Sequence, residues 1–162
     1  MEPETKLKGK LRTGFTTGTC ATAGAKAGIL AILSQKKIDV VDVILPKKSK
    51  IQIKILSCQF DKHGARCSVI KDGGDDPDVT HGAEIITHVS LTDKPNQIEI
   101  DGGEGVGRVT KPGLGLEINS AAINPTPRKM ITENIQEVGR EILEKNSYKE
   151  YQFRECISCC IK

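Results

Sequence analysis

The sequence predicts an α+β fold, a two-layer sandwich in which a mixed sheet carries two main helices on one face. Two segments, one near each end of the chain, show the apolar spacing of amphipathic helices. Between them lie short β-branched segments separated by turn-forming residues, as in β-hairpins. Strands grouped between two helices favour an α+β domain over a series of βαβ units.

The first helix is predicted from about residue 20 to residue 36, with Thr19 as its N-cap. Its apolar positions recur on one helical face: Ala21, Ala25, Ile29, Ile32 and Leu33. The first turns carry Ala and Gly, whose small side chains let another backbone or a ligand come close.

Five segments follow that are predicted as strands: residues 38–45, 51–60, 65–70, 84–91 and 97–101. In the second segment the apolar alternation changes phase, which predicts a bulge near Leu56 and Ser57. The third segment is expected to return as the second strand of a hairpin. The last two flank a DKPN turn.

The second helix is predicted to open at Asn124 and Pro125, an N-cap followed by a proline near the first position. Its apolar positions step by three or four residues: Ile131, Ile135, Val138 and Ile142. The chain therefore divides into a flexible lead-in (residues 1–11), a domain (12–144) and an atypical tail (145–162). The tail has no clear period and is expected to be poorly packed.

Composition excludes several classes of protein. The 162 residues are 37% hydrophobic and 28% charged, which fits one globular core. Three Phe, two Tyr and no Trp are too few stacking rings for a single-strand nucleic-acid binder, and a net charge of +3 attracts polyanions weakly. No apolar run approaches the ~20 residues of a membrane span. We expect a soluble, cytoplasmic protein without nucleic-acid or membrane partners, and homo-oligomerisation stays open.

The six cysteines do not form the evenly spaced pattern of a disulfide framework. Three are single residues in apolar segments, where a free thiol packs as a small hydrophobic group: Cys20, Cys58 and Cys67. The other three crowd the tail: Cys156, Cys159 and Cys160. Their spacing is zinc-like, but a single knuckle without a second pair is weak evidence, and we assign no metal site.

A glycine-rich stretch follows the last predicted strand of the central group. Residues 101–107 contain D-x-G-x-G-x-G, which resembles the first motif of Rossmann-type methyltransferases. That motif requires a helix directly after the turn, and the following RVTKPG cannot form one. A glycine turn that exposes backbone N–H groups to a charged ligand and a hairpin loop without a ligand both remain open.

The second candidate is an acidic loop, in which Asp72, Asp75, Asp76 and Asp78 fall within seven residues. An EF-hand would need Glu at the twelfth position from Asp72, where this chain has Ala83. Close carboxylates repel one another unless a cation or hydrogen-bond donors satisfy them. A Mg²⁺ site, a solvated surface loop, and a site that holds a cationic substrate or accepts a proton remain possible.

The third candidate is a set of basic residues: Arg12, Lys26, Arg108, Lys111, Arg128 and Lys129. Arg108, Lys111 and Arg128 lie beside Gly or Pro, in segments where a side chain could clamp carboxylates or phosphates. Taken singly, each is better explained as an ordinary surface charge.

Four stretches taken together carry a resemblance: residues 14–27, 71–85, 102–115 and 122–131. In this order they closely resemble the CbiD family, the cobalt-precorrin-5B C1-methyltransferases of anaerobic cobalamin biosynthesis. The resemblance runs from about residue 11 to residue 143, roughly the first half of a typical member. Members of the family continue into a strand and a second α/β domain. The tail replaces that strand here, so a truncated or frame-shifted end is expected.

The resemblance implies that a methyl group passes from S-adenosylmethionine to C1 of a cobalt-bound tetrapyrrole. The substrate brings its own cobalt, so no metal site of the protein is expected. The enzyme has to align donor and acceptor, and alignment alone can contribute several kcal/mol. Two other outcomes stay open: an inactive fragment that only binds the tetrapyrrole, or a methyltransferase for another acidic small molecule.

The resemblance also implies roles for individual residues. The candidate catalytic carboxylates, which would face the positively charged donor, are Asp75, Asp76 and Asp78. The candidates for binding S-adenosylmethionine are Thr16, Thr17, Thr19, Gly103, Glu104, Gly105 and Gly107. The candidates for the carboxylates of the substrate are Arg108, Lys111, Arg128 and Lys129. We expect the loops 13–19, 72–82, 102–113 and 124–129 to converge on one cleft.

Overall fold

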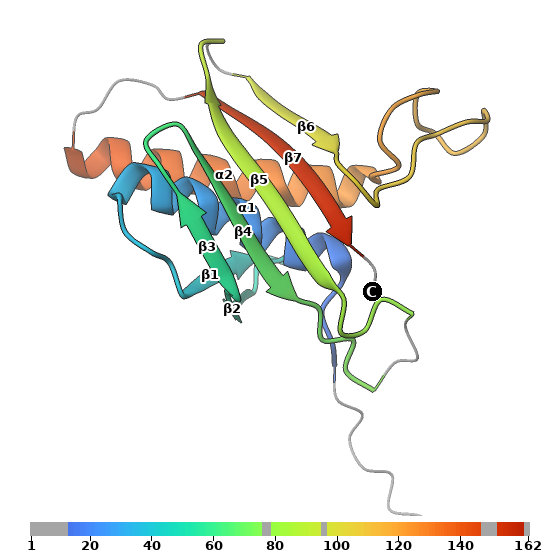
Figure 1. Ribbon diagram of the computed structural model, residues 1–162, viewed down its shortest axis with the longest axis horizontal. Helices are drawn as coiled ribbons and strands as arrows, with labels where there is room; N and C mark the ends of the chain where they lie inside the picture. Colours follow the sequence, from blue (N-terminus) through green and yellow to red (C-terminus); the bar gives the residue numbers. More distant parts are fainter. Residues whose placement is uncertain (1–12, 76–78, 95–96, 147–151, 161–162) are drawn as a thin grey trace, which may run out of the picture.

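The protein has an α+β fold in which both helices lie on one face of a five-stranded mixed sheet (Figure 1). The computed structural model describes residues 13–75, 79–94, 97–146 and 152–160. In chain order the elements are α1 (Thr17–Ser34), β1 (Val40–Ile44), β2 (Lys50–Lys54), β3 (Ser57–Phe60), β4 (Gly64–Ile70), β5 (Glu84–Thr92), β6 (Ile98–Gly102), α2 (Pro125–Asn146) and β7 (Gln152–Cys160). The predicted fold class is confirmed.

The strands form two sheets. β1 and β2 make an antiparallel pair of their own, and the five-stranded sheet has the order β3-β4-β5-β7-β6. All pairs in the larger sheet are antiparallel except β6 with β7, which run parallel. The two strands that flank the DKPN segment are therefore present but do not pair with each other, because β7 lies between them.

The tail supplies that intervening strand. β7 pairs with β5 from Thr92↔Gln152 to Glu84↔Cys160 and with β6 on its other side. The expectation of a poorly packed tail is wrong for residues 152–160. The sequence pattern could not reveal this strand, because its place is set by backbone hydrogen bonding to β5 and β6 rather than by a period of its own. The interpretation of the tail as a truncated or frame-shifted end is not tested by this result.

The predicted bulge marks the point where the chain changes sheets. Leu56 donates its N–H to the Ser68 carbonyl at 2.8 Å, while Ser57 is the register partner of Ser68. Two successive residues thus face one residue of β4, as in a β-bulge. The segment read as one long strand is in fact β2 in the small sheet and β3 in the large one.

Helix α1 begins three residues before the position that the sequence suggested. Its N-cap is Thr16, whose backbone is extended and whose hydroxyl accepts the N–H of Thr19 at 3.0 Å. Thr19 is buried in the first turn, and its hydroxyl lies 2.9 Å from that of Thr16. The prediction of Thr19 as the N-cap is wrong, because the helix begins at Thr17 and the hydroxyl of Thr16 accepts an N–H of the first turn.

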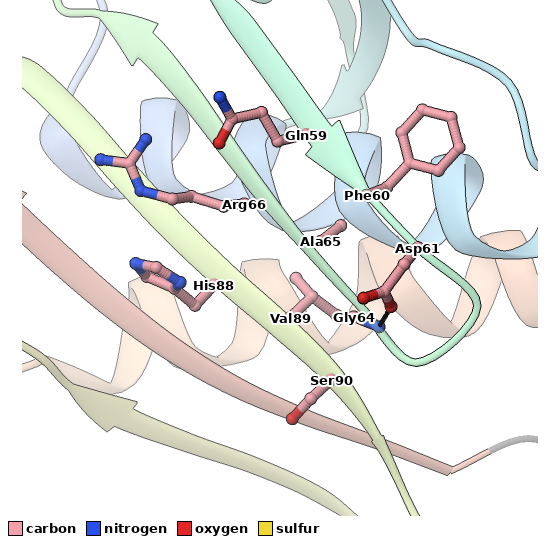
Figure 2. A pocket seen from close by; sticks show the side chains of 9 residues that line it. All are labelled: Gln59, Phe60, Asp61, Gly64, Ala65, Arg66, His88, Val89 and Ser90. Atoms are coloured by element: carbon pink, nitrogen blue, oxygen red, sulfur yellow. Dashed lines mark hydrogen bonds between the residues drawn. The ribbon is translucent and has the colours of Figure 1, made fainter.

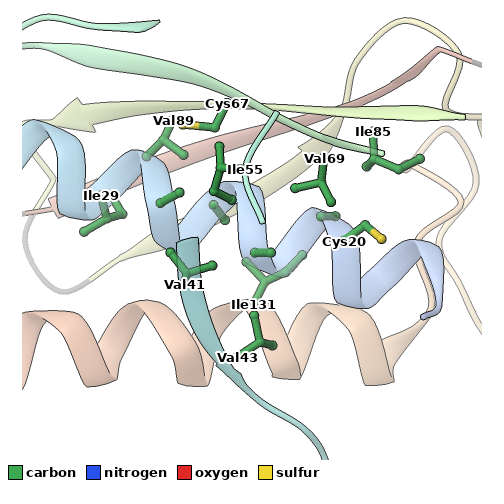
Figure 3. Close-up of a cluster of buried hydrophobic side chains, with 14 of the residues drawn as sticks. Cys20, Ile29, Val41, Val43, Ile55, Cys67, Val69, Ile85, Val89 and Ile131 are labelled. Carbon is green, nitrogen blue, oxygen red and sulfur yellow. The ribbon is translucent and has the colours of Figure 1, made fainter. Parts of the chain in front are cut away.

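Helix α1 lies between the large sheet and α2, so it is buried on more than one side (Figure 3). A Cβ on Gly24 would lie 2.6 Å from Thr87 Oγ1, and one on Gly28 would lie 2.9 Å from Val89 Cγ2. The small residues of this helix therefore serve close packing of its backbone on β5. The opposite side packs on the apolar stripe of α2, which is formed by Ile131, Ile135 and Val138.

The small sheet is attached to α2 through a buried amide. Asn134 accepts the N–H of Ile44 at 2.9 Å and donates to the Ile44 carbonyl at 3.0 Å. Its side chain is fully buried, so these bonds satisfy a group that would otherwise be costly to bury. Neither helix of the described part has the length and hydropathy needed to span a bilayer.

Candidate functional site

The four segments singled out in the sequence lie at one end of the molecule, where α1 and α2 begin and where β4, β6 and β7 end (Figure 1). Backbone and side-chain contacts connect them in series.

The segment before α1 lies directly on the start of the acidic loop. Phe15 donates its N–H to the Asp72 carbonyl at 2.7 Å, and Thr13 forms a bridge with Gly74. A Cβ on Gly14 would lie 2.0 Å from the carbonyl carbon of Gly73, so the two backbones approach as only glycine allows. The predicted approach of loops 13–19 and 72–82 is therefore real.

A buried lysine stabilises the base of the acidic loop. Lys71 is 1% exposed, and its ammonium donates to the Thr80 hydroxyl at 2.7 Å. Its backbone pairs with Ala83, whose carbonyl accepts the Lys71 N–H, and Gly82 donates to the Lys71 carbonyl. Sequence reasoning missed Lys71 because it followed a strand, where a lysine usually lies in solvent.

Inside the loop, backbone N–H groups are held by side chains. Gly73 donates to Nδ1 of His81 at 2.9 Å, and Gly74 donates to the Asp72 carboxylate at 2.8 Å. The candidate carboxylate Asp75 is exposed. Asp76 and Asp78 lie outside the described residues. Within the described ranges, no group of three or more His, Cys, Asp or Glu side chains is arranged to hold a metal ion.

The segment before α1 also contacts the start of α2. A Cβ on Gly18 would lie 3.0 Å from Cβ of Pro127, so the first turns of the two helices touch. Of the three threonines predicted to bind the donor, Thr16 is exposed, Thr17 is half-buried and Thr19 is buried. The hydroxyl of Thr16 already accepts an N–H as the N-cap.

Arg128 in the first turn of α2 ties that helix to the glycine-rich segment. Its guanidinium donates to three backbone carbonyls: Ile123 and Ile100 at 3.0 Å, and Ala121 at 3.3 Å. The Ala122 N–H in turn donates to the Gly107 carbonyl at 2.8 Å. Arg128 thus joins the start of α2 to β6 and to residues 121–123, and the Ala122 bond connects that segment to Gly107.

Arg108 forms a bidentate ion pair with Asp101, with N···O distances of 2.6 and 3.2 Å, and also donates to the Gly102 carbonyl at 2.9 Å. The bond from Arg108, followed by that from the Gly102 N–H, lowers the pKa of Asp101 below its usual value. In this structure both arginines expected to bind substrate are bonded to their own loops. Lys111 and Lys129 are exposed, and Lys129 lies 3.9 Å from Glu133.

The glycine-rich segment forms no helix after β6. Gly105, with φ of 83°, follows Glu104 in a turn that the Val106 N–H closes onto the Gly103 carbonyl at 3.2 Å. The chain then makes an exposed loop and returns, with Val109 and Ser120 joined by a backbone bond. The Rossmann arrangement that the motif resembled is absent from the described residues.

These contacts bring the four segments together, but neither of two cavities formed by the described residues is lined by all four. One, of about 220 Å³, lies between Lys48, after β1, and the first turns of α2, so it touches loop 124–129 through Lys129 but not the other three loops. The other, of about 470 Å³, lies on the open face of the large sheet. Convergence on a single cleft therefore stays a prediction.

Comparisons with known proteins identify relatives of this chain. The chain matches the CbiD family over residues 4–148. It is 52% identical over 128 residues to the cobalt-precorrin-5B C(1)-methyltransferase of Leptospira interrogans serovar copenhageni, a match covering 79% of this chain and 35% of that protein. The protein of the same name from Geobacillus thermodenitrificans is 49% identical over 133 residues, covering 82% of this chain and 36% of that protein.

A solved structure is also similar, the crystal structure of a cobalamin biosynthesis protein (cbiD) from Archaeoglobus fulgidus. The TM-score is 0.60 at 28% sequence identity, and the match covers 93% of this chain and 45% of that chain. This chain spans about a third of the length of the curated relatives described above.

Proposed function

Because the chain belongs to the CbiD family, we propose that it acts in the methylation of cobalt-precorrin-5B at C1 during cobalamin biosynthesis. The observation that carries the proposal is the contact of all four family-like segments at one end of the fold. The complete reaction is a proposal for this chain because it spans about a third of the curated relatives.

The methyl donor is proposed to be S-adenosylmethionine. In the transfer, the bond from sulfur to the methyl carbon breaks as the bond to C1 forms, and a neutral thioether remains. The sulfonium and the ammonium of the donor are positive, so nearby carboxylates favour their binding. Asp75 is exposed on the acidic loop, and Lys71 with Thr80 stabilises the base of that loop. We assign this loop to the donor, with the glycine turn Gly103–Gly107 as a second contact.

The tetrapyrrole substrate is proposed to bind through its carboxylates to basic side chains. Lys111 and Lys129 are exposed at the same end of the molecule and suit this role. We assign Arg108 and Arg128 to hold the binding loops in shape. Both ligands are charged small molecules made inside the cell, so a cytoplasmic location belongs to the same proposal.

A binding module without transferase activity is the second candidate. The observation that favours it is that the exposed Lys111 and Lys129 can bind carboxylates without any site for a methyl donor. Such a module would bind the cobalt tetrapyrrole and leave it unmethylated.

The test is to incubate the chain with S-adenosylmethionine and enzymatically prepared cobalt-precorrin-5B and to follow product mass. Gain of one methyl group, reduced strongly in Asp75→Asn but not in Asp93→Asn, would support the proposal. Asp93 is the matched control because it is an exposed carboxylate in another turn. Binding of the tetrapyrrole without transfer would favour the binding module. If the chain neither binds nor methylates the tetrapyrrole, both candidate functions are wrong.

A further inference from the structure

The open face of the large sheet carries a groove of about 470 Å³ that belongs to none of the four family-like segments. It crosses β3, β4 and β5 on the side of the sheet away from the helices (Figure 2).

Three polar side chains line this groove as one row across neighbouring strands. Gln59 of β3 is the register partner of Arg66 of β4, and Arg66 is the register partner of His88 of β5. Side chains of directly paired residues lie on the same face of a sheet, about 5 Å apart at Cβ. Figure 2 shows all three on the open face, side by side.

The hollow arises because the next row of the same face has almost no side chains. Gly64 lies two residues before Arg66 on β4, and its register partner on β5 is Ser90. Residues two apart on a strand share a face, so Gly64 and Ser90 lie beside Arg66 on the open face. Because Gly64 has no side chain and that of Ser90 is short, the surface there is lower than at Arg66. A ligand can therefore lie next to Arg66 without displacing protein atoms.

The positive charge of Arg66 is not paired with the carboxylate in the lining of the groove. Among the described residues, the half-buried Arg66 guanidinium makes no hydrogen bond and no ion pair with the protein. Burial, and after it the positive charge of Arg66, lowers the pKa of His88. The one carboxylate of the lining is Asp61, whose Oδ1 accepts the N–H groups of His63 and Gly64 at 2.7 and 2.9 Å. An anion beside Arg66 would compensate the guanidinium.

We propose that this groove binds a carboxylate group of a small-molecule ligand, with Arg66 as the main contact and the Gln59 amide as a second donor. A guanidinium presents parallel N–H groups that match both oxygens of a carboxylate. Gln59 is exposed, and its amide can donate from the neighbouring strand. The site is separate from the proposed methyl-transfer site and does not depend on it.

The experiment is a titration of the full chain with citrate, followed by two-dimensional NMR, with the neutral trimethyl ester of citrate as the matched ligand. We expect citrate to shift signals of Arg66, Gln59 and His88, and the ester to leave them unchanged. Arg66→Gln should weaken citrate binding by about 10-fold or more, the effect of losing a charge-assisted hydrogen bond. Arg66→Lys should retain part of the affinity.

The control variant is Arg140→Ala, which removes an exposed arginine of α2 on the helical side of the fold. It should leave citrate affinity within about twofold of the wild type. All variants should keep the wild-type thermal midpoint, because neither arginine has a described partner to lose. Equal affinity of wild type and Arg66→Gln, or signal shifts confined to residues 71–83 and 103–124, would overturn the proposal. Wild-type affinity for the ester would overturn it as well.

Discussion

Lys26 and Glu137 form an ion pair with an N···O distance of 2.6 Å that joins α1 to α2. The same ammonium donates to the Asp42 carbonyl of β1 at 2.6 Å, so one lysine connects both helices and the small sheet. Lys26 is 6% exposed and the Glu137 side chain 16%. Lys26 is one of the six basic residues that the sequence offered as candidate binding groups, and in the fold its role is structural.

Replacing Glu137 by Gln should lower the free energy of unfolding by about 3 kcal/mol at neutral pH, because it leaves a buried ammonium without its counter-charge. Burial would raise the pKa of Glu137, but its bonds to Lys26 and Lys50 outweigh this and lower the pKa below its usual value. The stabilisation is therefore present above the usual pKa of a glutamate and is lost as pH falls through the lower, folded pKa. Urea unfolding at several pH values should show the two proteins converging in acid.

The control is Glu133→Gln, one turn earlier on α2. Glu133 pairs with Lys48 at 3.3 Å, and that lysine is 70% exposed. Exposed pairs contribute little, so a loss of at most about 1 kcal/mol is expected. An equal loss in both variants would contradict the structural role of Lys26.

Deleting residues 152–162 should lower the thermal midpoint by about 10 °C or more, or abolish cooperative unfolding. The described partner of β6 in the sheet is β7, and β5 would gain a free edge. Circular dichroism on heating measures the effect. Deleting only residues 161–162 leaves every described strand pair intact and should change little. A full-length midpoint in the longer deletion would show that β7 adds nothing to the fold.

Two glycine-to-alanine substitutions in the helices should change the free energy of unfolding in opposite directions. Gly24→Ala places a Cβ 2.6 Å from the buried Thr87 hydroxyl, and overpacking of this kind costs about 1–3 kcal/mol. Gly139→Ala in α2 meets no described atom within 4 Å and should stabilise by about 0.5–1 kcal/mol through helix propensity. Denaturant midpoints of the two variants give the comparison. A Gly24→Ala variant as stable as the wild type, or more stable, would mean that α1 does not pack on β5 at Thr87.

Removing the charge of Arg66 should raise the pKa of His88 towards its usual value. The rise should be incomplete in Arg66→Ala, because burial is the larger cause of the lowering and persists. Titration of the imidazole signals by NMR measures this directly. Arg140→Ala should leave the pKa of His88 unchanged. An unchanged pKa in the Arg66 variant as well would contradict the closeness of Arg66 to His88.

Cys67 should react slowly with iodoacetamide in the folded protein and fully after denaturation. Burial, together with the side-chain hydrogen bond to Cys58 on the neighbouring strand, raises the pKa of the Cys67 thiol. The thiolate is the reactive form, so a raised pKa slows the reaction. Peptide mass spectrometry separates this site from the other cysteines. The half-buried Cys58 serves as the internal reference and should react faster. Equal rates at both sites would contradict the burial of Cys67.

The sequence by itself determined the fold class, both helices, the family and the strands outside the tail, except that residues 51–60 were predicted as one strand and form β2 and β3. These features are local: helix starts, apolar periods and turn residues act over a few neighbouring positions. The stretch after residue 101 shows this, since a proline and glycines in RVTKPG excluded a helix without any knowledge of the fold. The four family-like segments were likewise recognisable because each is continuous in the chain.

Only the tertiary structure decided where β7 lies, why α1 is rich in small residues, and which charged groups are already bonded. Each depends on residues far apart in sequence: β7 on the edge of β5, Gly24 on Thr87, and Arg128 on the Ile100 carbonyl. The row of Gln59, Arg66 and His88 likewise exists only through strand register. The physical reason is that pairing and burial are set by non-local contacts, whereas a local pattern carries the type of an element but not its neighbour.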